Sequence, residues 1–145
     1  MLRNDEDQLV TLKTELSFIN SYAYLLKARY AHALQVNISV DEEYTLKCLP
    51  PLTLQVIIEN AILQNAFSKT APLEISINAE NDHHLVIRNN IQAKIVTEAM
   101  DYETGLDNLI NKYRLLNHSS ISIEEARTER VIRLPLITKI EKVAL

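Results

Sequence analysis

The sequence predicts an α+β domain, a sandwich of two layers in which a mixed, mostly antiparallel sheet is covered on one face by helices. Three segments place apolar residues at the helical spacing of three and four, and five segments alternate apolar with polar residues. The first pattern is typical of amphipathic helices and the second of strands with one buried face. Because the segments follow in the order α, β, α, β, β, α, β, β, they favour one mixed sheet with helices packed against it.

The first helical period runs over residues 9–33 as a heptad-like seam and predicts one long helix. The seam leaves two interpretations open: the helix packs on its own domain, or it continues an upstream helical bundle and helps that bundle to dimerise. A second helix is expected to begin at Pro50 and Pro51, because proline is tolerated in the first turn, and to run to about Phe67. The third helical period spans residues 105–116.

The expected strands cover residues 34–40, 73–79, 85–88, 121–124 and 130–136. The polar turn 81–84 joins the second and third strands into an antiparallel hairpin, and a charged turn joins the last two into another. Residues 91–102 show no clear period, so we expect a loop there with at most a short helical turn over residues 93–100.

The chain has 145 residues and a formal net charge of −4, from 15 basic and 19 acidic side chains. This length predicts one globular domain with a sizeable core. The acidic balance gives no reason to expect nucleic acid as a partner, since nucleic acid is recognised mainly through clusters of lysine and arginine. The single cysteine, Cys48, fits a reducing compartment, and no apolar stretch approaches the roughly 20 residues of a membrane span. We therefore expect a cytoplasmic domain.

Glycine is scarce in this sequence. Average usage of about 7% predicts roughly ten glycines in such a chain, whereas Gly105 is the single one. A Walker A loop and a Rossmann fingerprint need several glycines where backbone amides approach phosphate, and a nucleophile elbow needs them as well. These three site classes are therefore excluded.

The second helix is apolar around most of its circumference and is expected to be buried. At about 100° per residue, Thr53, Asn60 and Gln64 fall on one line of this helix, and Gln55 and Glu59 on another. A buried asparagine needs hydrogen-bond partners. Two interpretations stay open for Asn60: it caps a neighbouring loop, or its amide oxygen faces a cleft as a hard ligand suited to Mg²⁺ and, through the metal, to phosphates.

Five separate segments carry a resemblance to the ATP-binding catalytic domain of LytS-like sensor histidine kinases, which belong to the GHKL superfamily. They follow in the family's order: Glu15-Leu-Ser-Phe-Ile-Asn-Ser-Tyr22 with Arg29-Tyr30, Pro50-Pro-Leu-Thr-Leu-Gln55, Leu54-Gln-Val-Ile-Ile-Glu-Asn-Ala-Ile62, Asn89-Asn-Ile-Gln92, and Gly105-Leu-Asp-Asn-Leu109 with Lys112-Tyr-Arg-Leu-Leu116. The resemblance covers nearly the whole chain and ends in the strand at Leu134-Pro-Leu136. It implies a Bergerat-type fold, with ATP held between the helices and a mobile lid.

The resemblance also implies roles for residues of the second helix and of the strand after it. Asn60 matches the N-box asparagine that coordinates the Mg²⁺ bound to ATP, and Glu59 takes the adjacent motif position with a supporting catalytic role. Gln64 stands where relatives carry a histidine and is expected to line the nucleotide site. Asn89 takes the position of the aspartate that accepts a hydrogen bond from the adenine amino group, and an amide oxygen can still accept that bond.

On the third helix, Gly105, Leu106 and Asn108 match the second glycine box, where a helix N-terminus faces phosphate. Lys112 replaces an arginine that is common at its place. The sequence also departs from the family pattern. Ile91 and Ala93 stand where glycines are expected after the adenine-reading position, Glu103 stands at the first glycine of the second box, and Leu63 stands at a basic position. Each departure is expected to weaken the nucleotide site.

The function implied is that of the ATP-binding catalytic domain of a two-component sensor histidine kinase. Such a domain positions Mg·ATP for phosphoryl transfer to a histidine on an upstream domain, from which the phosphoryl group passes to a response regulator. None of the histidines of this chain, His32, His83, His84 and His118, has the neighbours of that phosphoacceptor.

We therefore expect residues 1–33 to be a helix that leads from an upstream phosphoacceptor and dimerisation region, and residues 34–145 to form the ATP-binding domain. The whole protein is expected to be a homodimer anchored in the cell membrane. The alternative is a degenerate, non-catalytic GHKL module that acts in dimerisation or partner docking.

Overall fold

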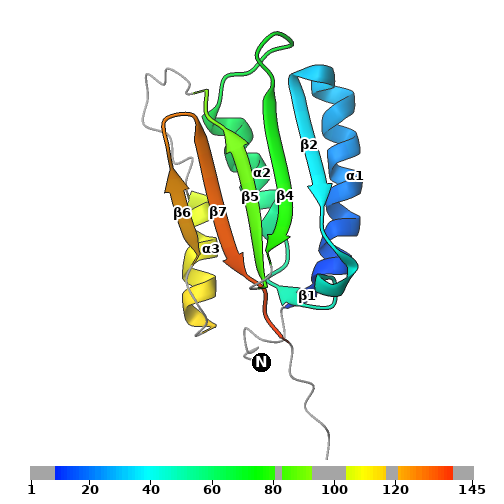
Figure 1. The fold of residues 1–145 in the computed structure, drawn as a ribbon, viewed down its shortest axis with the longest axis vertical. Helices are drawn as coiled ribbons and strands as arrows, with labels where there is room; N and C mark the ends of the chain where they lie inside the picture. The colour runs from blue at the N-terminus through cyan, green and yellow to red at the C-terminus, as the bar shows by residue number, and fades with distance from the viewer. Residues whose placement is uncertain (1–8, 81–82, 93–103, 117–120, 139–145) are drawn as a thin grey trace, which may run out of the picture.

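The computed structural model describes residues 9–80, 83–92, 104–116 and 121–138. In this part of the chain, a twisted five-stranded sheet carries the long helices on one face, as Figure 1 shows. The α+β sandwich predicted from the sequence is therefore confirmed. The expected helical turn over residues 93–100, together with Ala93 and Glu103, lies outside the described residues.

The sheet has the strand order β2-β4-β5-β7-β6. Its members are β2 (Leu34–Ser39), β4 (Leu73–Glu80), β5 (His84–Asn90), β6 (Ser122–Glu125) and β7 (Glu129–Pro135). β2 and β4 are parallel because a helix connects them, and the other neighbours are antiparallel. Both predicted hairpins are confirmed, although β5 extends two residues beyond the predicted end and so includes Asn89 and Asn90.

Three long helices form the second layer, namely α1 (Leu12–Tyr30), α2 (Thr53–Gln64) and α3 (Thr104–Leu115). Alternate positions of the central strands point toward them, and one row across the sheet joins Ile77, Ile87 and Ile132. The apolar alternation read from the sequence therefore builds the core between the layers.

The first helix is shorter at both ends than predicted. The preceding residues form β1 (Val10–Thr11), which pairs with an unpredicted strand, β3 (Cys48–Leu49). The Thr11 hydroxyl accepts a hydrogen bond from the backbone N–H of Thr14 at 3.2 Å and caps the helix. At the other end the chain turns at Ala31, with φ of 53°, into a short 3₁₀ turn over Ala31–Ala33.

The helix seam packs on its own domain in the described structure. Leu12, Ile19 and Leu26 are buried, and the helix contacts β2 and α2, whereas Tyr24 and Leu25 on the other side are exposed. This packing favours the first of the two interpretations for residues 12–30. The expected domain boundary between residues 33 and 34 stays a prediction.

A buried carboxylate links α1 to α2. Glu15 is 3% exposed, and its two oxygens accept hydrogen bonds from the backbone N–H groups of Leu52 and Leu54 at 3.1 and 3.0 Å. The N-cap residue of α2, Leu52, has φ of 65° and offers no side-chain cap of its own. The N–H groups of a helix start need acceptors and favour negative charge. Glu15 of α1 therefore caps the N-terminus of α2.

We expect Glu15→Gln to destabilise the domain, because an amide NH₂ facing one of these donors leaves a buried N–H group without an acceptor, at a cost of about 1–3 kcal/mol. Burial raises the pKa of Glu15 above its usual 4.5, and this effect is larger than that of the backbone hydrogen bonds, which lower the pKa. The folded state therefore takes up the proton at higher pH than the unfolded state, so the Glu15 contribution to stability is largest at low pH and falls as pH rises through the folded pKa.

Urea unfolding of both proteins across the acidic range measures this dependence. The stability gap between the wild type and Glu15→Gln is expected to widen as pH falls from neutral toward the usual pKa of a glutamate, since other carboxylates are common to both proteins. A gap that narrows on acidification would contradict the assigned direction.

Candidate functional site

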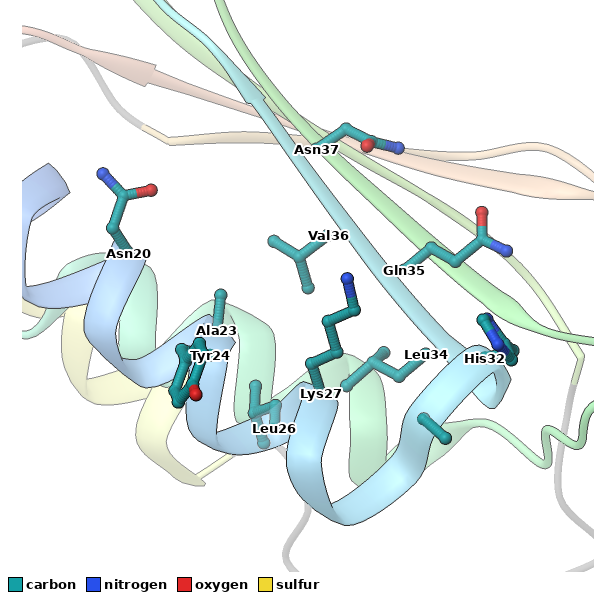
Figure 2. Close-up of a pocket in the computed structure, with 11 residues that line it drawn as sticks. Asn20, Ala23, Tyr24, Leu26, Lys27, His32, Leu34, Gln35, Val36 and Asn37 are labelled. Carbon is teal, nitrogen blue, oxygen red and sulfur yellow. The ribbon is translucent and has the colours of Figure 1, made fainter.

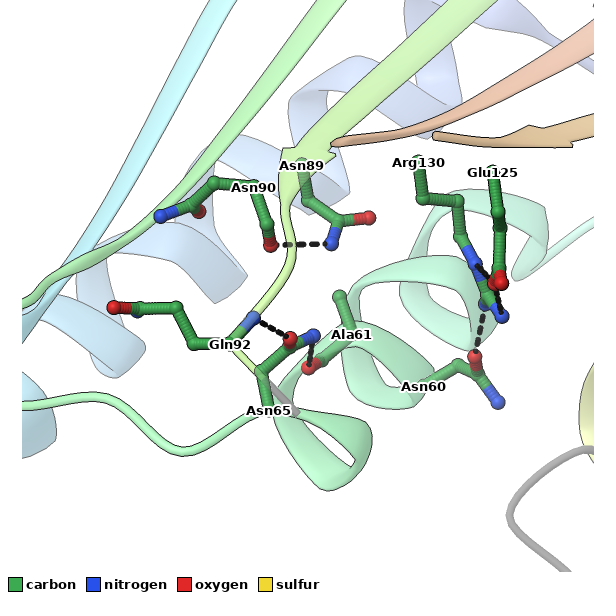
Figure 3. Close-up of polar contacts among 8 residues, drawn as sticks. All are labelled: Asn60, Ala61, Asn65, Asn89, Asn90, Gln92, Glu125 and Arg130. Carbon is green, nitrogen blue, oxygen red and sulfur yellow. Dashed lines mark hydrogen bonds and ion pairs between the residues drawn. The ribbon is translucent and has the colours of Figure 1, made fainter. Parts of the chain in front are cut away.

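Asn60 lies on the buried side of α2 and faces β7. Its side chain is 4% exposed, and its Oδ1 accepts a hydrogen bond from Nη1 of Arg130 at 3.0 Å. Arg130 is itself buried, and its guanidinium reaches Glu125 of the neighbouring strand β6 through Nε at 2.6 Å and also through Nη2. Figure 3 shows these three side chains forming a chain of polar contacts from the sheet to the helix. The structure therefore places a cation, the Arg130 guanidinium, at the side chain of Asn60.

Asn89 lies beside this group on β5. It is buried on the helix-facing side of the sheet, and it is the direct register partner of Arg130 on β7. Its Nδ2 donates to the backbone carbonyl of Asn90 at 2.9 Å (Figure 3). The structure thus brings Asn60 and Asn89, which are far apart in the sequence, to the same end of the sheet beneath α2.

Arg130 was not among the residues predicted from the sequence. The inward positions of β7 are Arg130, Ile132 and Leu134, so a single charged residue interrupts an apolar row. Charged side chains are almost never buried without a partner. A charged residue within an apolar row is therefore the feature of the sequence from which Arg130 could have been predicted.

Asn65 was not predicted from the sequence either, and its side chain positions the chain next to the site. Its Oδ1 accepts from the backbone N–H of Gln92 at 2.7 Å, and its Nδ2 donates to the carbonyl of Ala61 at 2.8 Å (Figure 3). The backbone N–H of Ala66 also donates to the carbonyl of Gln92 at 2.7 Å. These bonds explain why the prediction that α2 runs to Phe67 is wrong: the helix ends at Gln64, and Asn65 turns to hold the segment that leaves β5.

The predicted residues of α3 line a groove against the start of α2. Gly105, Asn108 and Lys112 share one side of α3, and the groove of about 410 Å³ is completed by residues such as Val56 of α2. A Cβ on Gly105 would meet Cγ1 of Val56 at 3.3 Å, so the glycine permits close approach of the two helices. Leu106 instead points into the core and is 1% exposed.

Val56 and Asn60 lie one turn apart on α2, so the groove and the buried polar group adjoin the same side of this helix. The structure thus brings together Asn60, Asn89 and Arg130, and it places Gly105, Asn108 and Lys112 in the neighbouring groove, whose lining includes none of those three residues.

Sequence comparison finds relatives among sensor kinases. The chain is 30% identical over 135 residues to the sensor histidine kinase BtsS of Escherichia coli, covering 88% of this chain and 24% of that protein. It is also 30% identical over 96 residues to the sensor histidine kinase/phosphatase LytS of Staphylococcus aureus, covering 63% of this chain and 16% of LytS. The chain therefore spans a quarter or less of the length of these two relatives. No protein-family model matches it.

Solved structures agree in fold. The histidine kinase domain of the blue-light activated kinase EL346 from Erythrobacter litoralis superposes with a TM-score of 0.56 over 94% of this chain and 66% of that domain, at 18% identity. Full-length ShkA in complex with AMPPNP gives a TM-score of 0.53 over 90% of this chain and 31% of ShkA, at 13% identity. The chain belongs to the sensor histidine kinase family.

Within this kinase domain, Glu59 is adjacent to Asn60 in the sequence, but the two side chains lie on different sides of α2. Glu59 is exposed, and its Oε1 accepts hydrogen bonds from the Tyr22 hydroxyl at 3.1 Å and from Nε2 of Gln55 at 3.0 Å. Burial, followed by the charge of Glu59, raises the pKa of Tyr22 to about 12. Glu59 thus contacts α1, and its expected supporting role stays a prediction. Gln64 is half-buried one turn beyond Asn60, and its role is likewise a prediction.

The kinase domain has a second groove, between α1 and β2, of about 460 Å³. Figure 2 shows Lys27 and Tyr24 of α1 and Val36 of β2 around it. It contains none of the residues predicted for the nucleotide site. Among the described residues, no group of three His, Cys, Asp or Glu side chains is placed to hold a metal ion.

We expect Asn65→Ala to lower the free energy of unfolding of this kinase domain by about 1–3 kcal/mol, because it removes the acceptor of a backbone N–H group and the donor to Ala61. Thermal or urea unfolding measures the loss. Asn108→Ala is the matched control, since Asn108 is exposed on α3, and we expect its effect to stay within about 0.5 kcal/mol. Equal effects of the two changes would contradict a structural role for Asn65.

Proposed function

We propose that this domain binds ATP and presents its γ-phosphate to a histidine on another domain of the same protein. The observation that carries the proposal is the convergence of Asn60, Asn89 and Arg130 beside the groove lined by Gly105, in a chain of the sensor histidine kinase family. The AMPPNP complex of ShkA, which shares the fold, supports an adenine nucleotide as the ligand.

Each side chain has a proposed task in this site. Asn89 accepts the hydrogen bond from the adenine amino group, and Asn60 faces the phosphates from α2. Gly105, Leu106 and Asn108 stand in the first turns of α3, where backbone N–H groups favour an anion, and Lys112 adds positive charge one turn further on. In phosphoryl transfer the protein takes little part in the covalent chemistry. These groups therefore act by positioning the nucleotide and by stabilising the charge on its phosphates.

The resemblance assigns a Mg²⁺ ion to Asn60, and this role stays a prediction. The described residues do not fit a metal there: the Asn60 oxygen accepts a hydrogen bond from the Arg130 guanidinium at 3.0 Å, and a metal at that oxygen would face a positive charge. No step of the proposed function is therefore assigned to the metal.

In the whole protein, we propose an upstream phosphoacceptor domain, a homodimer and a response regulator as partners, and anchoring in the cell membrane. The names of BtsS and LytS as sensor histidine kinases support this assignment to a two-component phosphorelay. Within the described residues, no helix is long and apolar enough to cross a membrane.

Titration with ATP tests the proposal, with calorimetry or the rise in melting temperature as readout. We expect saturable binding at millimolar nucleotide or below. Asn89→Ala is expected to weaken it by about tenfold or more, which corresponds to the loss of about one buried hydrogen bond. Asn37→Ala is the matched control, since Asn37 is exposed on β2 at the edge of the same sheet. Absence of saturable binding by the wild type would favour the non-catalytic module instead.

Gly105 provides an independent test. We expect Gly105→Val to weaken ATP binding by about tenfold or more, because the added methyl groups force α3 away from Val56 and displace the first turn of the helix. Gly105→Ala is the milder control, since one methyl group at 3.3 Å requires only a small shift and alanine favours the helix. If both variants bind ATP as the wild type does, the α3 N-terminus has no part in binding.

A further inference from the structure

The guanidinium of Arg130 is held in place from two sides. Arg130 is 8% exposed, at an inward position of β7. Glu125 is its direct register partner on β6, accepts a hydrogen bond from Nε and forms an ion pair with Nη2 of the guanidinium. On the other side, Nη1 donates a hydrogen bond to Oδ1 of Asn60. A guanidinium cannot lose its proton in a protein, so a permanent positive charge stands at this asparagine.

This arrangement fixes which atom of the Asn60 amide faces the sheet. A guanidinium only donates hydrogen bonds, so the partner must be the amide oxygen and not the NH₂ group. The same oxygen is the atom that would coordinate a hard cation. Arg130 and a metal ion therefore compete for one ligand atom, and their like charges would lie within a few ångström of each other.

We propose that Arg130 takes the place of Mg²⁺ at Asn60, so that this domain binds the nucleotide triphosphate without a metal ion. The proposal rests on the proposed ATP-binding function. Arginine suits the role because its planar, permanently charged guanidinium recognises phosphate oxygens through more than one N–H group. The Glu125 side chain is 50% exposed, so its carboxylate can turn to water and release N–H groups of Arg130 to a phosphate.

The experiment measures ATP binding to the full chain by calorimetry in excess chelator and in excess Mg²⁺. For the wild type, we expect the two dissociation constants to agree within about threefold. For Arg130→Met, which keeps the length of the side chain and removes the charge, we expect binding in chelator to weaken by about tenfold or more. With the Asn60 oxygen released, binding by this variant becomes dependent on Mg²⁺.

Arg133→Met is the matched control. Arg133 lies on the same strand but on the opposite face of the sheet, where its guanidinium is paired with Glu80 at 3.5 Å and Glu124 at 3.6 Å. Its removal changes the net charge equally, so a general electrostatic effect would weaken binding by both variants alike. Glu125→Gln is a second test that retains Arg130. We expect it to bind ATP in chelator at least as tightly as the wild type, because a carboxylate that competes for Arg130 and repels phosphate is gone.

The outcomes separate this inference from the proposed function. Binding by the wild type that requires Mg²⁺ would overturn the inference and leave the ATP-binding function standing. Tighter binding of Mg·ATP by Arg130→Met than by the wild type would overturn it too, since Arg130 would then block the site. Absence of saturable binding under either condition would overturn the proposed function, and the inference with it. Should Arg130→Met fail to fold in a melting experiment, the wild type and Glu125→Gln still decide the question.

Discussion

The position of the site depends on one buried carboxylate, Glu15. The second helix starts at a residue in the left-handed region and has no side-chain cap, so its first N–H groups need an acceptor from elsewhere. Glu15 of α1 supplies both oxygens to them. Burial, and then the Glu15 charge, raise the pKa of Tyr113 on α3. Glu15 therefore joins α1 to the start of α2, and α2 extends from this point to present Asn60 to β7.

Much of the fold follows from patterns within single segments. Alternation in β4 and β7 and the helical period of α3 depend on which side of each element faces the core, and such periods are visible in the sequence. The burial of Asn60 also followed from a helix that is apolar on most sides. That Asn60 and Asn89 come together was implied by the family resemblance, because no local pattern relates residues on different elements.

The ends of the helices and the role of Arg130 could not be predicted, because they depend on contacts between distant segments. The end of α2 is set by Asn65, whose side chain binds the backbone of Gln92, and the start of α1 by pairing of β1 with β3. In both places the local periodicity continues past the true end of the helix, and long-range hydrogen bonds override it. Arg130 is similar: its partners lie on α2 and β6, and only its charge within an apolar row marks it in the sequence.

The scarcity of glycine and the burial of Arg130 are connected in the proposed site. Glycine loops bind phosphate through backbone N–H groups, because the absence of a Cβ lets the backbone approach the anion. With Gly105 as the single glycine of the chain, few backbone groups can serve in this way, and positive charge has to come from side chains. Lys112 lines the groove on α3 and Arg130 stands at Asn60. A guanidinium held by the sheet keeps its charge at a fixed place without backbone flexibility, so a site poor in glycine can still carry an ordered cation toward phosphate.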